Sequence, residues 1–173
     1  MLQEGSRKKI ILTRPVVESG ENLGFLPGDI NEKIAPYMKS FISNMGKILH
    51  RPEKITSMIE RKIIDMEPLA FMRGDSYDDS IMVLDEAQNT DMRQLMLFTT
   101  RLGHNSSMII SGDITQWDLR QRRGELKHYY ENIIKDVPNC TLFQFGREDI
   151  VRNPLLIAIT DNYEKYKEAN NLD

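Results

Sequence analysis

Two acidic residues follow an apolar run, and their position indicates a site for metal-assisted chemistry. The apolar run 81–84 is followed directly by Asp85 and Glu86. Such a run predicts a buried strand, and ligands of open α/β sheets collect beyond the carboxyl ends of the strands. We therefore expect Asp85 to hold a phosphate-bound Mg²⁺ ion and Glu86 to orient or deprotonate an attacking water. The alternative is that both acids simply begin a loop, with a residue among 89–91 capping the next helix.

A second apolar run, at residues 108–110, ends in the polar segment 111–116. The two small residues that begin this segment allow backbones to approach closely. The amide of Gln116 can accept a hydrogen bond from water and donate one to a γ-phosphate, so we predict a phosphate sensor that lies beside Asp85. The alternative is an Asx turn at Asp113 with a solvated Gln116.

Three arginines are further candidates for contacts at this site. Arg14 ends a predicted strand, where it could touch nucleotide, nucleic acid or a neighbouring subunit; the alternative is a surface ion pair. Arg147 and Arg152 could each reach a γ-phosphate as a finger or sensor. The alternative for this pair is ion pairing with Glu148 or Asp149 at the start of a helix.

The segments that must position these residues alternate between strand and helix patterns. Strands are predicted at 9–13, 81–85, 107–112 and 140–145, and helices at 91–102, 124–135 and 154–169. Gly103 is expected to cap the first of these helices at its carboxyl end. This order predicts an α/β fold with a mainly parallel sheet covered by helices on both faces. We expect one domain over 1–173, with an inserted region at about 16–74 that holds a helix from Glu32 to about Arg51 and an edge strand within 63–71.

Composition narrows the class of protein further. The 173 residues are 40% hydrophobic and 28% charged, which is typical of a folded globular domain. A net charge of −3 and a pI near 5.7 argue against a surface that binds nucleic acid by positive charge alone. The single cysteine, Cys140, excludes disulfide and zinc frameworks and is expected to be a buried strand residue. No apolar run approaches the roughly 18 residues of a membrane span, so we expect a cytoplasmic protein without a membrane partner.

Several of these segments together resemble the PhoH family of P-loop ATPases. The resemblance runs from about Lys9 to Tyr166 and implies a RecA-like core related to superfamily one helicases. It also implies ATP and Mg²⁺ as ligands, coupling to RNA or DNA, and often a ring-shaped homo-oligomer with nucleotide at the subunit interfaces. The segments that carry it most strongly are Val83-Leu84-Asp85-Glu86-Ala87-Gln88-Asn89, Thr100-Arg101-Leu102-Gly103 and Ser111-Gly112-Asp113-Ile114-Thr115-Gln116-Trp117-Asp118-Leu119.

The sequence departs from the family pattern in one respect. No segment matches Gly-x-x-x-x-Gly-Lys-Ser/Thr, the Walker A loop whose amides and lysine hold the phosphates. In the family this loop lies upstream of the segment 11–15, so we expect the central phosphate-loop strand to be missing through truncation, a split gene or genuine loss. Two hypotheses follow: Mg-dependent ATP hydrolysis by the complete protein, or a catalytically inactive PhoH-like module that binds a partner or nucleic acid.

Overall fold

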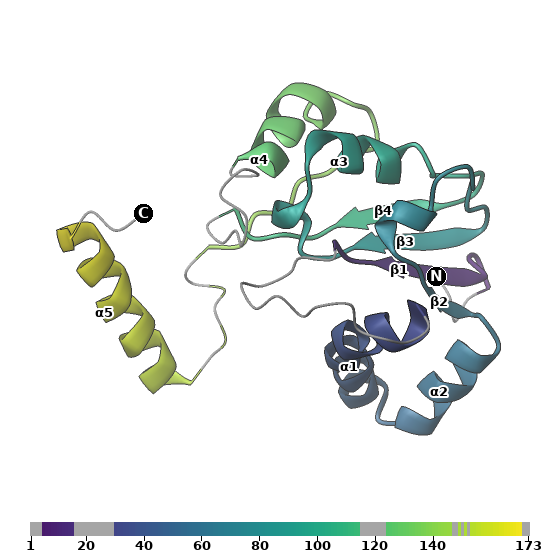
Figure 1. Ribbon diagram of the computed structural model, residues 1–173, viewed down its shortest axis with the longest axis horizontal. Helices are drawn as coiled ribbons and strands as arrows, with labels where there is room; N and C mark the ends of the chain where they lie inside the picture. Colours follow the sequence, from purple (N-terminus) through teal and green to yellow (C-terminus); the bar gives the residue numbers. More distant parts are fainter. Residues whose placement is uncertain are drawn as a thin grey trace. The chain divides into compact units, whose positions relative to one another are not determined.

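The computed structural model describes residues 5–15, 30–114, 124–146, 149, 151 and 153–170. The chain divides into two compact units, Met1–Val137 and Pro138–Asp173. The first unit holds a parallel β-sheet and the helices that cover it, and the second holds one long helix (Figure 1). No helix within the described ranges combines the length and the apolar character needed to cross a membrane.

The first unit is built on a sheet of four strands that all run parallel. Their order across the sheet is β2-β1-β3-β4, which places β1 and β3 in the middle. Parallel strands present their carboxyl ends at one common edge, so residues that follow β1, β3 and β4 are neighbours in space. The strands are β1 (Lys9–Thr13), β2 (Ile64–Met66), β3 (Ser80–Leu84) and β4 (Ser107–Ile110).

Helices pack on both faces of this sheet, as Figure 1 shows. Alternate strand residues point to opposite faces, so Ile11 belongs to one core cluster and its neighbour Leu12 to the other. The core cluster around Ile11 includes Phe98, whereas the cluster around Leu12 includes Ile55. The first face is covered by α3 (Met92–Thr99) and α4 (Glu125–Tyr129), and the second by α1 (Ile30–Leu49) and α2 (Pro52–Glu60).

Shorter helical turns join these elements. A 3-10 turn, η1 (Leu69–Phe71), follows β2, and a second, η2 (Ala87–Asn89), follows β3. A π-helical turn, η4 (Tyr130–Ile134), continues directly from α4. The second unit contains α5 (Pro154–Asn170).

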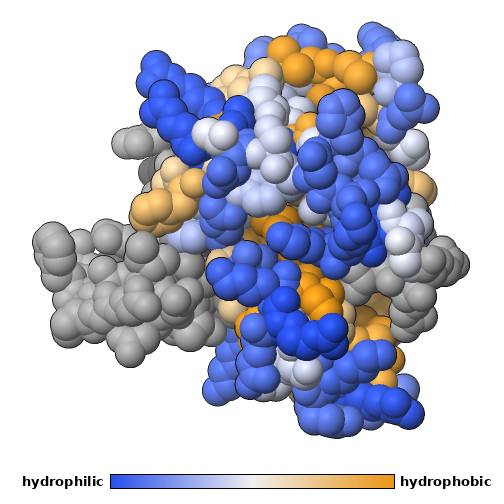
Figure 2. All heavy atoms as spheres, turned by 90° about the vertical axis from the view of Figure 1, so that its right-hand side faces the viewer, coloured by the Kyte–Doolittle hydropathy of each residue, from blue (hydrophilic) through white to orange (hydrophobic). Residues whose placement is uncertain are grey.

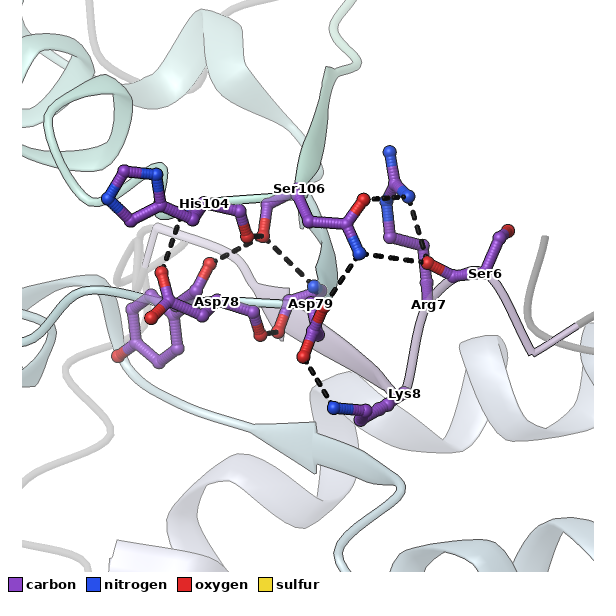
Figure 3. Close-up of polar contacts among 10 residues, drawn as sticks. Ser6, Arg7, Lys8, Asp78, Asp79, His104 and Ser106 are labelled. Carbon is purple, nitrogen blue, oxygen red and sulfur yellow. Dashed lines mark hydrogen bonds and ion pairs between the residues drawn. The ribbon is translucent and has the colours of Figure 1, made fainter.

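A polar network holds together the starts of three strands at the amino edge of the sheet (Figure 3). Lys8 donates to Asp79 over 2.6 Å, Asn105 donates to the other oxygen of Asp79 over 2.6 Å, and Arg7 donates to Asn105 over 2.7 Å. The Lys8 ammonium holds the pKa of Asp79 below its usual value. Because Arg7, Lys8, Asp79 and Asn105 precede β1, β3 and β4, the network aligns the strands. It lies at the edge opposite the acids that follow β3.

On the face shown in Figure 2, most of the described surface is hydrophilic.

Most predicted elements are confirmed. The first strand has the predicted bounds, and the strands predicted at 81–85 and 107–112 end one or two residues earlier. The helix predicted from Glu32 to about Arg51 is α1, and the two predicted at 124–135 and 154–169 are also present. The predicted edge strand is present but covers only Ile64–Met66, because η1 begins beyond Pro68. The loop at 16–29 lies outside the described residues.

Two sequence predictions are wrong. Residues 140–145 form no strand, and Cys140 is exposed rather than buried. An apolar run becomes a strand only where a neighbour completes its hydrogen bonds, and no described strand pairs with this segment. The helix predicted at 91–102 ends at Thr99, so Gly103 does not cap it. Gly103 instead lies against the backbone of Tyr77, where a Cβ atom would be only 2.6 Å from the carbonyl carbon.

Candidate active site

Three adjacent strands deliver polar residues to the carboxyl edge of the sheet. Arg14 follows β1, Asp85 follows β3, and Ser111 follows β4. The ladder continues one residue beyond the strands, because the amide of Asp85 donates to Thr13 O over 3.0 Å and that of Ser111 donates to Leu84 O over 2.8 Å. These bonds hold the three strand ends side by side, so the loops that follow begin from one rigid platform.

Asp85 has the surroundings of a metal ligand. Its side chain is half-buried, and its carboxylate makes no hydrogen bond or ion pair within the part of the chain that the structure describes. Among those same residues there is no group of three or more His, Cys, Asp or Glu side chains that could enclose a metal ion. A divalent ion at Asp85 would therefore take its other ligands from water and phosphate, which is the usual manner of Mg²⁺.

Glu86 is held in a defined orientation by its backbone and by two partners. Its backbone lies in the left-handed region at φ 54° and ψ 39°, which non-glycine residues rarely adopt and which is often found at functional sites. One carboxylate oxygen pairs with Arg14 Nη2 at 2.9 Å. The other oxygen accepts a hydrogen bond from Gln88 Nε2 over 2.6 Å. A carboxylate that is restrained at both oxygens is suited to orienting a water molecule.

The loop after β3 is also tied to the loop after β4. Ala87 N donates to Ser111 O over 2.9 Å, and Asp113 N donates to Gln88 Oε1 over 3.1 Å. The close contact requires a glycine at position 112, because a Cβ atom on Gly112 would lie 2.9 Å from Gln88 Oε1. The two polar loops therefore form one connected structure.

The charges at this edge favour a cation. Asp85, Glu86 and Asp113 are acidic residues, whereas Arg14 is the one basic residue that follows the described strand ends here. Paired acidic groups beside the ends of strands concentrate cations, and a bound cation in turn attracts phosphate. These residues could hold a metal ion together with an anionic ligand.

The structure brings together three of the residues that we predicted to form the site. Arg14, Asp85 and Glu86 lie at one edge, where Arg14 forms an ion pair with Glu86, and the predicted contact of Arg14 with nucleotide, nucleic acid or a neighbouring subunit stays a prediction. Gln116, Arg147 and Arg152 lie outside the described residues, so their roles and the predicted proximity of Gln116 to Asp85 stay predictions.

Sequence reasoning missed one member of the site, Gln88. It is 5% exposed and contacts both polar loops. Its place two residues after Glu86, within the segment 83–89 that resembles the family, is the signal that could have identified it. The sequence alternative for the polar residues 89–91 is correct in part, because Asp91 caps α3 through a capping box with Gln94.

A parallel sheet with helices on both faces, and acids at its carboxyl edge, defines an α/β protein with a RecA-like core. The family model described as PhoH-like protein matches residues 1–164. This chain belongs to the PhoH-like protein family, which is a family of P-loop ATPases.

Curated relatives agree with this assignment. A PhoH-like protein of Bacillus subtilis is 42% identical over 164 residues, covering 95% of this chain and 51% of the relative. A PhoH-like protein of Synechocystis is 41% identical over 162 residues, covering 94% of this chain and 49% of the relative. Protein PhoH of Escherichia coli is 40% identical over 149 residues, covering 85% of this chain and 42% of the relative. The chain spans about half the length of the curated relatives it matches.

Proposed function

We propose that this chain supplies the metal-binding and water-activating residues for Mg-dependent ATP hydrolysis by a PhoH-like protein. The observation that carries the proposal is that two adjacent carboxylates differ in their hydrogen bonds and ion pairs. The Asp85 side chain makes no hydrogen bond or ion pair within the described chain, whereas Glu86 is held at both oxygens. A metal ligand needs an oxygen that is not already engaged, and a residue that orients water needs a fixed direction.

ATP and Mg²⁺ are the proposed ligands, with Asp85 as the metal residue. In P-loop ATPases the metal neutralises the β- and γ-phosphates while a carboxylate or amide positions the attacking water. Gln116 is the proposed γ-phosphate sensor, and Arg147 and Arg152 are the proposed arginines for the transition state. Coupling to RNA or DNA and assembly into a ring of subunits belong to the proposal on the strength of the family resemblance.

A second candidate function is a PhoH-like interaction or nucleic-acid-binding module without catalytic activity. The observation that favours it is the absence of a Gly-x-x-x-x-Gly-Lys-Ser/Thr motif from the sequence. One carboxylate cannot replace a cradle of amides and a lysine, so this chain alone should bind ATP weakly. Calorimetry with ATP and Mg²⁺ distinguishes the two functions when the chain is compared with a longer polypeptide in which a family phosphate-loop segment precedes it.

Two substitutions in the longer polypeptide test the assigned roles. Glu86→Gln should retain ATP binding but lower turnover by at least about 100-fold, because the amide keeps the shape and loses the basicity. Asp85→Asn should weaken binding only when Mg²⁺ is present, because the ion loses an anionic ligand. Both are measured by calorimetry with and without Mg²⁺ and by phosphate release.

Glu60→Gln is the matched control, since it makes the same change on an exposed residue at the end of α2. It should leave both binding and turnover at the parental level. If Glu86→Gln hydrolyses ATP at the parental rate, Glu86 is not the catalytic carboxylate. If the longer polypeptide does not hydrolyse ATP at all, the inactive module is the correct function.

A further inference from the structure

The side-chain amide of Gln88 connects two loops that both lie at the candidate active site. Its nitrogen donates to Glu86 Oε2 over 2.6 Å, and its oxygen accepts from the backbone N–H of Asp113 over 3.1 Å. An ionised carboxylate only accepts and a backbone N–H only donates, so these partners permit a single orientation of the amide. Gln88 therefore binds the loop after β4 through its oxygen and the Glu86 carboxylate, in the loop after β3, through its nitrogen.

Burial makes this connection stiffer than the ion pair on the other side of Glu86. Gln88 is 5% exposed, so its side chain is confined by packing. In the Arg14–Glu86 pair, by contrast, both side chains are about one-third exposed, at 33% and 37%. An ion pair this exposed is screened by salt, so it restrains the carboxylate less than the buried Gln88 does.

The surrounding backbone is shaped to keep the amide in place. A Cβ atom on Gly112 would meet Gln88 Oε1 at 2.9 Å and the backbone nitrogen of Gln88 at 3.1 Å. Gly112 is therefore needed for the loop after β4 to approach Gln88 this closely. A shift of that loop would move Asp113 N–H, and the bond from Asp113 would carry the shift through Gln88 to the carboxylate of Glu86.

We propose that Gln88 is a positioning residue that fixes the Glu86 carboxylate and couples it to the loop after β4. This inference rests on the proposed function, in which Glu86 orients the attacking water. The coupling gives the site a means of control, because a movement of Asp113 in the loop after β4 would reach Glu86 through Gln88. Gln88 itself touches no reacting atom, so its loss should affect turnover rather than nucleotide affinity.

Two substitutions separate the parts of this role. Gln88→Glu keeps the shape and the acceptor for Asp113 N–H, but it removes the donor to Glu86 and places a second carboxylate beside it. Gln88→Met has a similar length and removes both hydrogen bonds. Gln94→Glu is the matched control, because its oxygen accepts from Asp91 N in the cap of α3 and a carboxylate keeps that bond.

The first measurement uses this chain and requires no ATP. Thermal unfolding is compared for Gln88→Glu, for Glu86→Gln and for the double variant. Gln88→Glu should lower Tm by about 2–4 °C, because the contact to Glu86 loses its donor. Adding Glu86→Gln should restore at least about half of that loss, because its amide again supplies a donor. Glu86→Gln added to Gln94→Glu should restore nothing. Absence of this rescue in the Gln88→Glu pair would overturn the inference, since the two side chains would not be in contact.

The second measurement is turnover in the longer polypeptide that carries a phosphate loop. Gln88→Met should lower kcat by about 10- to 100-fold with little change in KM, because misplacement of a catalytic group slows the chemical step. Parental kcat in Gln88→Met, when Glu86→Gln abolishes turnover, would overturn the positioning role and leave the proposed function intact. Absence of turnover in the unsubstituted polypeptide would reject both, while thermal unfolding would still report on the contact.

Discussion

Gly112→Ala tests whether the two loops of the candidate site meet as closely as the structure shows. The added Cβ atom would lie 2.7 Å from Leu126 Cδ2, 2.9 Å from Gln88 Oε1 and 3.1 Å from Gln88 N. All three distances are shorter than ordinary van der Waals contact, so neighbours must move. The φ angle of Gly112 is not in the left-handed region, and the expected effect is therefore steric rather than conformational.

The magnitude follows from what has to move. Inserting a methyl group into a packed contact typically destabilises a protein by about 1–3 kcal/mol. At Gly112 the two shortest contacts are the ends of side chains, which can rotate, so we expect about 1–2 kcal/mol. In a domain of this size each kcal/mol lowers Tm by roughly 2–4 °C. The predicted fall in Tm is therefore about 2–8 °C, measured by circular dichroism together with urea unfolding.

The loss of stability in Gly112→Ala can be compared with the loss in Gly103→Ala. Its Cβ atom would lie 2.6 Å from both the carbonyl carbon and the carbonyl oxygen of Tyr77, which belong to the backbone. Backbone atoms cannot turn aside, so Gly103→Ala should destabilise the protein more than Gly112→Ala does. Combining Gly112→Ala with Leu126→Ala should relieve part of the strain, giving a coupling of about 0.5–1 kcal/mol in a double-mutant cycle. The reasoning is refuted if Gly112→Ala unfolds at the parental temperature or is the more harmful of the two glycine substitutions.

Two further predictions concern the backbone of Glu86 and the phenol of Tyr77. Because Glu86 is left-handed at φ 54°, Glu86→Gly should be more stable than Glu86→Ala by about 1 kcal/mol in urea unfolding; equal stabilities would mean that the strained conformation is not kept. Burial and the hydrogen bond to Glu67 raise the pKa of Tyr77 above its usual 10.0, so the stability from its neutral phenol is complete below pH 10 and falls as pH rises further. Tyr77→Phe should therefore be less stable than the parent by about 1 kcal/mol at pH 8, and the difference should shrink above pH 10; a constant difference would contradict this.

Local patterns in the sequence were sufficient for most of the secondary structure. The apolar run before Asp85 identifies β3, because four apolar residues in succession suit a strand that is covered on both faces. The helix after it begins at Met92, and the side chain of the preceding Asp91 accepts from the amide of Gln94. The same patterns placed Arg14, Asp85 and Glu86 at the ends of strands, and parallel pairing of those strands was enough to predict a shared edge.

Tertiary structure decided what depends on contacts between distant residues. The apolar run 140–145 has a strand pattern but forms no strand, because strand formation needs hydrogen-bond partners that the run itself does not contain. The sequence shows two acids in succession. Only the fold distinguishes Asp85, which has no hydrogen bond or ion pair among the described residues, from Glu86, which Arg14 and Gln88 restrain. The contact between Gln88 and Asp113 joins residues 25 positions apart and depends on the small volume of Gly112. A pattern along the chain reports the period and chemistry of nearby residues, whereas these contacts arise when β3 and β4 pair and bring their loops together.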